Sequence, residues 1–313
     1  MIAVLGSFDG FHLGHQMLFE SAKSMAANTS DSWCVVTFFP HPQSVLGRKS
    51  FHALFSETEK DILARCLEIP EIIRIPFSRS FAGMGPEPFF ETLEKTLFVT
   101  GLIVGEDFRF GKDREGDSHL LRKLAILRGW KTTIVPAYSI DDQKVSSTSI
   151  RKKVISGDTR GAALELGYPF SILGMVKHGD GRGRNIGFPT LNLDLPGGKT
   201  IPARGVYTGS AAWRGRSFPA AISIGTNPTF PGNRELRCEA HIPGFKEDLY
   251  GEWVNLFFFR RIRREVTFGS PSALVAQMQR DVVESLDTWN QIDPDTRRFI
   301  ECSMPDKKVH PPG

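Results

Sequence analysis

Short β-rich runs alternate with longer amphipathic stretches over the first 137 residues of this chain, and no other feature constrains its fold as strongly. The apolar, β-branched runs occupy residues 2–6, 33–39, 72–77, 101–105 and 132–137. The apolar spacing between them predicts helices over residues 16–27, 57–67, 88–97 and 119–128. This order predicts an α/β domain with a doubly wound parallel sheet, in which ligands bind beyond the carboxyl ends of the strands.

The second half of the chain has a different pattern. A short helix over 159–166 is followed by glycine-punctuated β segments at residues 171–179, 205–213, 218–225, 237–242 and 253–262. These segments predict a small β-barrel, which a terminal amphipathic helix over 270–286 would cover. We therefore expect an α/β domain over residues 1–160, a barrel domain over 161–302, and a disordered tail over 303–313 with three prolines and no apolar period.

The charge balance argues against a nucleic-acid binder. The chain carries 39 basic and 35 acidic residues, for a net charge of only +4. Its densest basic run, Arg260 to Arg264, lies among aromatic and β-branched residues, which is typical of a strand with a solvated face. The chain opens on an apolar run without a basic leader, and no apolar stretch approaches the roughly 18 residues of a membrane span. We expect a cytoplasmic protein with no nucleic-acid, membrane or obligatory protein partner.

The string GSFDGFHLGH at residues 6–15 follows the first predicted strand and opens the first helix. Glycine amides and a helix N-terminus would converge there, as in sites that hold nucleotide phosphates. His12 and His15 could both donate hydrogen bonds to charge that develops at phosphorus. A bare HxGH is also typical of a metal site or a packed histidine pair. The other candidate phosphate contacts of this motif are Gly6, Phe8, Asp9 and Gly14.

Two further motifs follow later strands. VSSTSIR at residues 145–151 precedes a helix and offers hydroxyls and a guanidinium for phosphates that leave as pyrophosphate; its candidate residues are Ser146, Ser147, Thr148 and Arg151. An ordinary helix cap is the alternative. In VGEDFRFG at residues 104–111, Phe108 and Phe110 favour contact with a flat ligand, although aromatic residues at a strand end are commonly core residues.

Together with FFPHP at residues 38–42, these motifs resemble the adenylyltransferase module of bacterial FAD synthetase over about 150 residues. The resemblance implies that the FMN phosphate attacks the α-phosphorus of ATP. It further implies that His12 and His15 stabilise the transition state and that Mg²⁺ neutralises the phosphates. Flavin contacts are expected at Asp107, Phe108 and Phe110.

The run HGDGRGRNIGFPTLN at residues 178–192 is rich in glycine and arginine, and its backbone could approach phosphates closely. The candidate phosphate contacts are Gly179, Arg182, Gly183, Arg184 and Gly187. A β-hairpin loop without a ligand is the alternative. The Thr190 hydroxyl suits Mg²⁺, and Asn192, two residues further along a strand, projects to the same side. Glu239 in RCEAH is a candidate general base, or equally a partner in a surface ion pair.

The segments GRGRNIGFPTLN, GVYTG, SIGTNPTF, CEAHI and DLYG are similar in order and type to the riboflavin kinase module, a small β-barrel with a terminal helix. This resemblance implies that Thr190 and Asn192 serve the metal and ATP. It makes Glu239 the base that takes a proton from the ribityl hydroxyl during γ-phosphoryl transfer. Both resemblances together predict an enzyme that converts riboflavin to FMN and FMN to FAD, with ATP as co-substrate and Mg²⁺ in both reactions.

Three other functions remain open from the sequence. The chain could be an FMN adenylyltransferase whose barrel only binds flavin or regulates. It could be a different nucleotidylyltransferase, acting on pantetheine phosphate or on a cytidylyl acceptor, because HxGH is shared among these enzymes. An RNA-binding protein ranks last, since only the arginine run and the barrel favour it.

Overall fold

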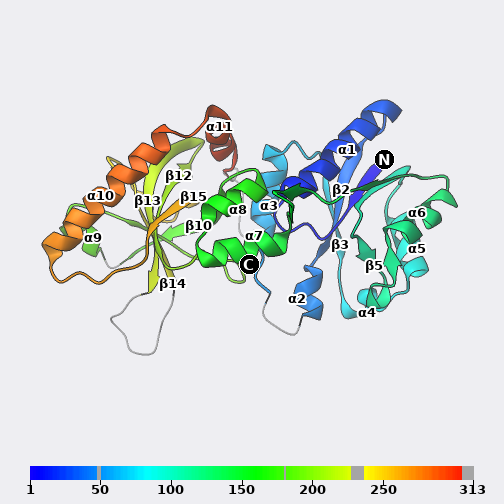
Figure 1. The fold of residues 1–313 in the computed structure, drawn as a ribbon, viewed down its shortest axis with the longest axis horizontal. Coiled ribbons are helices and arrows are strands. Elements are labelled where there is room, and N and C mark those ends of the chain that lie inside the picture. Colours follow the sequence, from blue (N-terminus) through cyan, green and yellow to red (C-terminus); the bar gives the residue numbers. More distant parts are fainter. Residues whose placement is uncertain (48–50, 180, 227–235, 305–313) are drawn as a thin grey trace. The chain divides into compact units, whose positions relative to one another are not determined.

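The computed structural model describes residues 1–47, 51–179, 181–226 and 236–304, without the side chains of residues 182 and 185. The chain forms two compact units, which Figure 1 shows as ribbons. The first unit holds Met1–His52 and Leu63–Ser146, and the second holds Ala53–Ile62 and Ser147–Gly313.

The first unit is built on a parallel sheet with the strand order β3-β2-β1-β4-β7. Its strands are β1 (Ile2–Leu5), β2 (Trp33–Phe39), β3 (Ile72–Pro76), β4 (Gly101–Gly105) and β7 (Lys131–Val135). β1 pairs in parallel with both β2 and β4, so the chain winds outward from β1 in both directions. The doubly wound parallel sheet is therefore confirmed, and its order reverses beyond the carboxyl ends of β1 and β4.

Helices connect these strands, and short hairpins extend the loops after β4 and β7. The helices are α1 (Leu13–Thr29), α2 (Pro42–Leu46), α3 (Glu57–Cys66), α4 (Arg79–Ala82), α5 (Pro86–Thr96) and α6 (Ser118–Ile126), with the 3₁₀ turn η1 (Lys112–Arg114). The hairpins pair β5 (Arg109–Phe110) with β6 (Gly116–Asp117) and β8 (Ser139–Ile140) with β9 (Gln143–Lys144). The division between the two units runs through α3 after Ile62. Every residue of β1 is buried, as expected for a central parallel strand.

The second unit contains a closed antiparallel barrel with the strand order β10-β11-β14-β13-β12-β15. Its strands are β10 (Phe170–Lys177), β11 (Leu191–Leu193), β12 (Gly205–Trp213), β13 (Arg216–Thr226), β14 (Leu236–His241) and β15 (Trp253–Arg263). Buried apolar residues face one another across the pairs, as in Leu191 opposite Ala240 and Ile224 opposite Cys238, and fill the interior. The helices are α7 (Ser147–Ser156), α8 (Thr159–Leu166), α9 (Arg182–Asn185), α10 (Pro271–Asn290) and α11 (Pro294–Cys302). The predicted barrel and terminal helix are confirmed.

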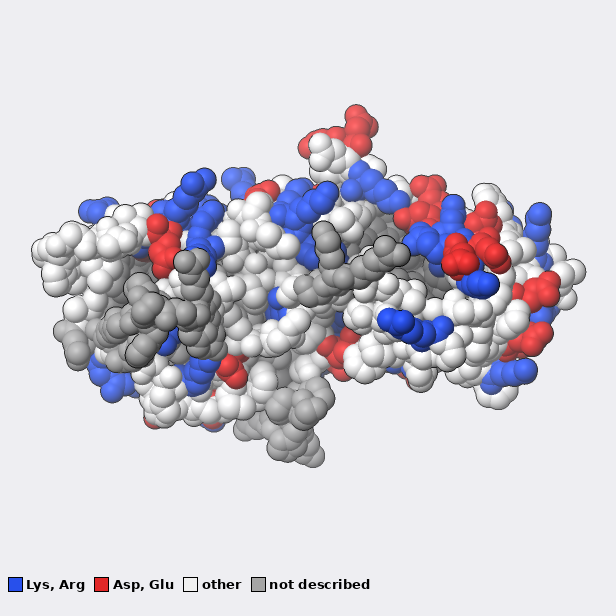
Figure 2. Space-filling model, turned by 90° about the horizontal axis from the view of Figure 1, so that it is seen from below, with Lys and Arg blue, Asp and Glu red and all other residues white. Residues whose placement is uncertain are grey.

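The basic run forms the end of β15, which confirms its prediction as a strand. Arg263 donates to Asp281 of α10 at 2.7 Å, and Arg260 donates to Glu284 at 2.6 Å. α10 begins after Ser270, whose hydroxyl accepts the Ala273 amide. The run therefore attaches the terminal helix to the barrel. On the face shown in Figure 2, basic and acidic side chains are interspersed.

The segment Ala53–Ile62 belongs to the barrel unit, although it comes from the N-terminal part of the chain. Ser56 and Glu59 form a capping box at the start of α3, where the Ser56 amide donates to Glu59 at 2.7 Å and the Glu59 amide donates to the Ser56 hydroxyl at 3.3 Å. The Glu59 carboxylate also accepts the Leu173 amide of β10 at 3.0 Å and the Lys199 ammonium at 2.8 Å. Both charged side chains are at most 3% exposed. This buried pair anchors the segment in the second unit.

The two units differ from the domain boundaries expected at residues 160 and 303. α7 and α8 belong to the barrel unit, where the Thr159 hydroxyl donates to the Phe259 carbonyl at 3.2 Å. Ser303 and Met304 are buried instead of disordered, because the Asn255 amide donates to the Ser303 carbonyl at 2.9 Å. The rest of the predicted tail, residues 305–313, lies outside the described residues. Contacts distant in sequence decide both boundaries.

Candidate active sites

The turn between β1 and α1 carries the glycine and histidine motif at the carboxyl edge of the sheet. Gly10 has a φ of 78°, a left-handed conformation that glycine adopts without strain. α1 begins directly after His12, and its first turn carries no carboxylate. The positive end of the α1 dipole therefore lies at this turn and favours an anion such as a phosphate.

His12 and His15 lie face to face, with ring centroids 3.5 Å apart and ring planes 18° from parallel. His12 caps α1, because its Nδ1 accepts the His15 amide at 3.3 Å. In a neutral imidazole the other nitrogen then carries the hydrogen, so His12 can offer Nε2–H to a ligand. The structure thus brings the two predicted catalytic histidines together at a helix N-terminus.

The other predicted phosphate contacts of this motif have different surroundings. A Cβ atom at Gly6 would lie 2.7 Å from the Phe8 ring, and one at Gly14 would lie 3.3 Å from the His12 ring. Both glycines thus make room for neighbouring rings. Phe8 and Asp9 are each only 1% exposed, and the Phe8 ring packs edge-on against His15 at 4.8 Å. The Phe8 ring therefore packs in the core against His15, and its contact with a phosphate stays a prediction.

Asp107 lies in the loop after β4 and binds Lys144 of the β8–β9 hairpin, with 2.6 Å between Oδ2 and Nζ. Burial alone would raise the pKa of Asp107, but the hydrogen bond and positive charge of Lys144 lower it more, so the pKa lies below its ordinary value. Asp107 is therefore ionised at neutral pH and ties together the loops that follow β4 and β7.

Phe108 and Phe110 stack with ring centroids 5.8 Å apart, but only Phe108 is partly exposed. Phe110 is 5% exposed and packs in the core, 5.0 Å from the Phe89 ring. A Cβ atom at Gly116 would strike the Phe110 ring at 2.7 Å, so this glycine allows the close packing. Phe110 is therefore a core residue that packs against Phe108, and its predicted flavin contact stays a prediction.

The motif VSSTSIR crosses the division between the two units. Ser146 ends the first unit, whereas Ser147, Thr148 and Arg151 lie on α7 in the second. α7 is attached to α8, because Ser149 donates to Glu165 at 2.5 Å and Lys153 forms an ion pair with the same carboxylate. The pyrophosphate-binding role of the four predicted residues stays a prediction.

Thr190, Asn192 and Glu239 meet on one face of the β11–β14 pair. Asn192 of β11 lies directly opposite Glu239 of β14 in an antiparallel pair, and such partners project from the same face of a sheet. Their sequence neighbours, including Leu191 and Cys238, are buried in the barrel interior. Thr190 directs its Oγ1 toward Oε2 of Glu239 at 3.4 Å. The structure therefore assembles the predicted metal-binding pair and the predicted base.

The glycine-rich loop between β10 and β11 fits tightly at two of its predicted positions. A Cβ atom at Gly179 would lie 2.1 Å from the Asn192 amide nitrogen, so this backbone lies directly against the Asn192 side chain. At Gly183 a Cβ atom would strike the Phe188 carbonyl oxygen at 2.2 Å, and the Phe188 amide donates to Gly183 at 2.8 Å. Gly187 takes a φ of 82°. The Arg182 side chain lies outside the described part of the chain.

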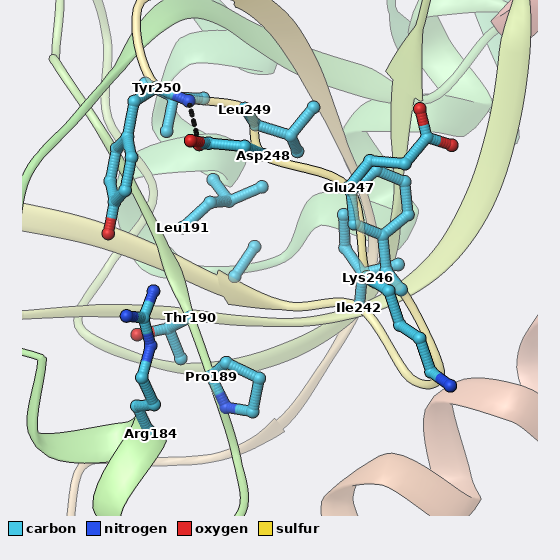
Figure 3. Close-up of a pocket in the computed structure, with 13 residues that line it drawn as sticks. Arg184, Pro189, Thr190, Leu191, Ile242, Lys246, Glu247, Asp248, Leu249 and Tyr250 are labelled. Atoms are coloured by element: carbon cyan, nitrogen blue, oxygen red, sulfur yellow. Dashed lines mark hydrogen bonds between the residues drawn. The ribbon is translucent and has the colours of Figure 1, made fainter.

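A cavity of about 330 Å³ lies beside Thr190, between the start of β11, the end of β14 and the loop before β15. Figure 3 shows Arg184, Thr190 and Tyr250 along one side of it. Apolar side chains form much of the remaining wall: Val176, Leu191, Ala240, Ile242, Phe245 and Leu249. The Tyr250 ring stacks on His178 with centroids 3.8 Å apart. Lys246, Glu247 and Asp248 also line the cavity, so polar and apolar side chains share its wall. A cavity of this volume with an aromatic ring and an arginine can hold a small molecule.

Sequence reasoning did not select Tyr250 or His178 as site residues. A usable signal was present, because Asp248 precedes Tyr250 by two residues and its side chain accepts the Tyr250 amide at 3.0 Å, forming an Asx turn that leaves the ring 41% exposed. The NPTF part of SIGTNPTF, residues 227–230, lies outside the described residues.

The donors at Thr190 and Asn192 suit Mg²⁺, which prefers oxygen ligands and often takes few from the protein, the rest coming from water and substrate phosphates. Within the described ranges, no group of three or more His, Cys, Asp or Glu residues could hold a metal. In the same ranges, no helix is both long enough and apolar enough to span a membrane.

Comparisons with known proteins cover both halves of the chain. The FAD synthetase family matches residues 1–149, and the riboflavin kinase family matches residues 166–288. The bifunctional riboflavin kinase/FMN adenylyltransferase of Listeria monocytogenes is 34% identical over 90% of each chain, and that of Bacillus subtilis is 33% identical over 91% of each. A Streptococcus pneumoniae crystal structure titled macrolide-efflux protein superposes with a TM-score of 0.84 at 32% identity, covering 93% of this chain and 94% of that one. The chain therefore belongs to the bifunctional riboflavin kinase/FMN adenylyltransferase family.

Proposed function

We propose that this chain phosphorylates riboflavin to FMN in its second unit and adenylylates FMN to FAD in its first, with Mg²⁺ and ATP in both reactions. One observation carries the proposal: a chain that pairs His12 with His15 at a helix N-terminus also assembles Thr190, Asn192 and Glu239 on its barrel. The cytoplasmic location, and the absence of nucleic-acid, membrane and obligatory protein partners, stay predictions.

In the adenylylation, an oxygen of the FMN phosphate forms a bond to the α-phosphorus of ATP, and pyrophosphate leaves. His12 and His15 donate hydrogen bonds to phosphate oxygens that gain charge, and the N-terminus of α1 adds its dipole. Phe108 offers its partly exposed ring to the flavin, beside Asp107. Catalysis of this kind depends on positioning and electrostatics, without a covalent enzyme intermediate.

In the phosphorylation, Glu239 accepts the proton of the terminal ribityl hydroxyl while that oxygen bonds to the γ-phosphorus and ADP leaves. Thr190 and Asn192 would hold Mg²⁺, which would neutralise charge on the phosphates. The cavity beside Tyr250 would take the nucleoside, and Arg184 in its wall would contact the phosphates.

Incubating the purified full chain with riboflavin, ATP and Mg²⁺ tests the proposal. Chromatography should detect FMN first and FAD later, and chelation of Mg²⁺ should stop both reactions. Formation of FAD from FMN without formation of FMN from riboflavin would instead favour an adenylyltransferase with a flavin-binding or regulatory barrel. If neither product forms with oxidised or reduced flavin, the proposal is wrong.

Replacing His15 with alanine should lower the rate of FAD formation about a hundredfold, because removing one donor from a preorganised phosphate site costs on the order of 3 kcal/mol in the barrier. Riboflavin phosphorylation should continue at the wild-type rate, and separate assays from FMN and from riboflavin measure the two activities. His119→Ala is the matched control, since His119 is an exposed residue of α6. Equal loss of both activities in His15→Ala would contradict separate sites.

Gly179→Ala should weaken the kinase, because the new Cβ atom would displace the Asn192 amide that it meets at 2.1 Å. Misplacing a positioning group by about 1 Å can cost up to a hundredfold in rate, and we expect a loss on the order of tenfold to a hundredfold. Steady-state riboflavin phosphorylation measures the loss. Gly197→Ala is the control, since a Cβ atom there meets no atom within 4 Å and should change nothing.

A further inference from the structure

We infer that His241 is a positioning residue of the kinase site: it holds the carbonyl of Pro189 and so fixes Thr190 against Glu239. The inference rests on the proposed kinase function. His241 is two residues beyond Glu239 on β14, so both side chains leave the strand on the same face. Its Nδ1 lies 2.8 Å from the Pro189 carbonyl oxygen.

The direction of this hydrogen bond follows from its chemistry. A carbonyl oxygen can only accept, so Nδ1 of His241 carries the hydrogen and donates it. Pro189 itself has no amide hydrogen and cannot donate to a β ladder. The pairing of β11 with β14 starts one residue after Thr190, at Leu191 opposite Ala240. The His241 ring therefore holds Pro189 in place just before the backbone pairing of β11 with β14 begins.

Two functional parts of the chain lie on either side of the Pro189 carbonyl. On one side, Thr190 directs its hydroxyl to Glu239 at 3.4 Å. On the other, the Phe188 ring packs against His241 at 5.2 Å, and the Phe188 amide closes the glycine-rich loop onto Gly183. Loss of the His241 donor would therefore release the end of that loop and the Thr190 hydroxyl together.

Asparagine and glutamine replacements separate this role from simple packing. The amide nitrogen of asparagine can occupy the position of the imidazole Nδ1, whereas that of glutamine reaches the position of Nε2. Both carry the same amide group. His241→Asn should therefore restore the hydrogen bond to Pro189, and His241→Gln and His241→Ala should not.

The first experiment is amide hydrogen exchange of the full chain without ligand. The peptide covering residues 183–192 should exchange about tenfold faster in His241→Ala and His241→Gln, because one hydrogen bond contributes roughly a factor of ten. His241→Asn should exchange at nearly the wild-type rate. Unchanged exchange in all three variants, or equal behaviour of asparagine and glutamine, would overturn the inference.

The second experiment measures the Mg²⁺ concentration that gives half-maximal riboflavin phosphorylation. It should rise about tenfold in His241→Ala and His241→Gln and recover in His241→Asn, while the KM for riboflavin stays constant. A lower kcat with an unchanged Mg²⁺ requirement would indicate a structural role only and overturn the inference. Absence of phosphorylation in the wild-type chain would instead defeat the proposed function, and the exchange experiment would still decide whether His241 anchors the loop.

Discussion

Glu239→Gln should lower the rate of riboflavin phosphorylation by about 10²-fold to 10⁴-fold, the range that a positioned general base contributes. Glutamine keeps the size of glutamate, and its amide oxygen can still accept the hydrogen bond from Thr190. It cannot take a proton from the ribityl hydroxyl at neutral pH. Single-turnover formation of FMN at saturating ATP measures the loss directly.

A matched carboxylate provides the control for this variant. Glu284 on α10 forms a partly exposed ion pair with Arg260, and such pairs contribute little. Glu284→Gln should therefore keep the rate within a few-fold. FAD formation from FMN should be unchanged in Glu239→Gln. A near-normal rate of riboflavin phosphorylation in Glu239→Gln would show that Glu239 belongs to a surface pair and is not the base.

Glu59→Gln should lower the free energy of unfolding of the second unit by about 3–5 kcal/mol, since breaking a buried ion pair leaves an uncompensated charge. The Lys199 ammonium is 1% exposed and would keep the Leu54 carbonyl at 2.7 Å and the rings of Phe55 and Phe170 as neighbours. None of these neutralises its charge. Lys199→Met should have a similar effect, because it leaves the buried Glu59 carboxylate without its ion-pair partner.

Urea unfolding of the full chain can test this prediction if the two activities are followed separately. Kinase activity should be lost at a lower urea concentration than in the wild-type chain; adenylyltransferase activity should follow it only as far as the predicted contacts Ser147, Thr148 and Arg151 of the second unit are needed. Arg298→Gln is the control, because it breaks an exposed ion pair with Asp295 in the same unit and should cost less than about 1 kcal/mol. Equal midpoints for Glu59→Gln and Arg298→Gln would contradict the anchoring role of the buried pair.

Local patterns predicted the elements and several of the site residues. Apolar runs and helical spacing are set by near neighbours, and they placed β1, α1 and the histidine motif in their observed order. These local patterns could not show that Phe110 is buried while Phe108 is partly exposed, because both residues belong to one short segment. Phe110 is buried by Phe89 and Gly116, which lie elsewhere in the chain. It also missed Tyr250, whose exposure depends on an Asx turn.

The sequence by itself determined the two kinds of domain and the motifs at the ends of their strands. The reason is that strand and helix periodicities depend on residues only a few positions apart. Only the tertiary structure decided which distant residues meet. The register of β11 on β14 brings Thr190 within 3.4 Å of Glu239, 49 residues away, and burial pairs Glu59 with Lys199 across 140 residues. Strand register and buried charge pairing depend on the whole folded core, so no local pattern contains them.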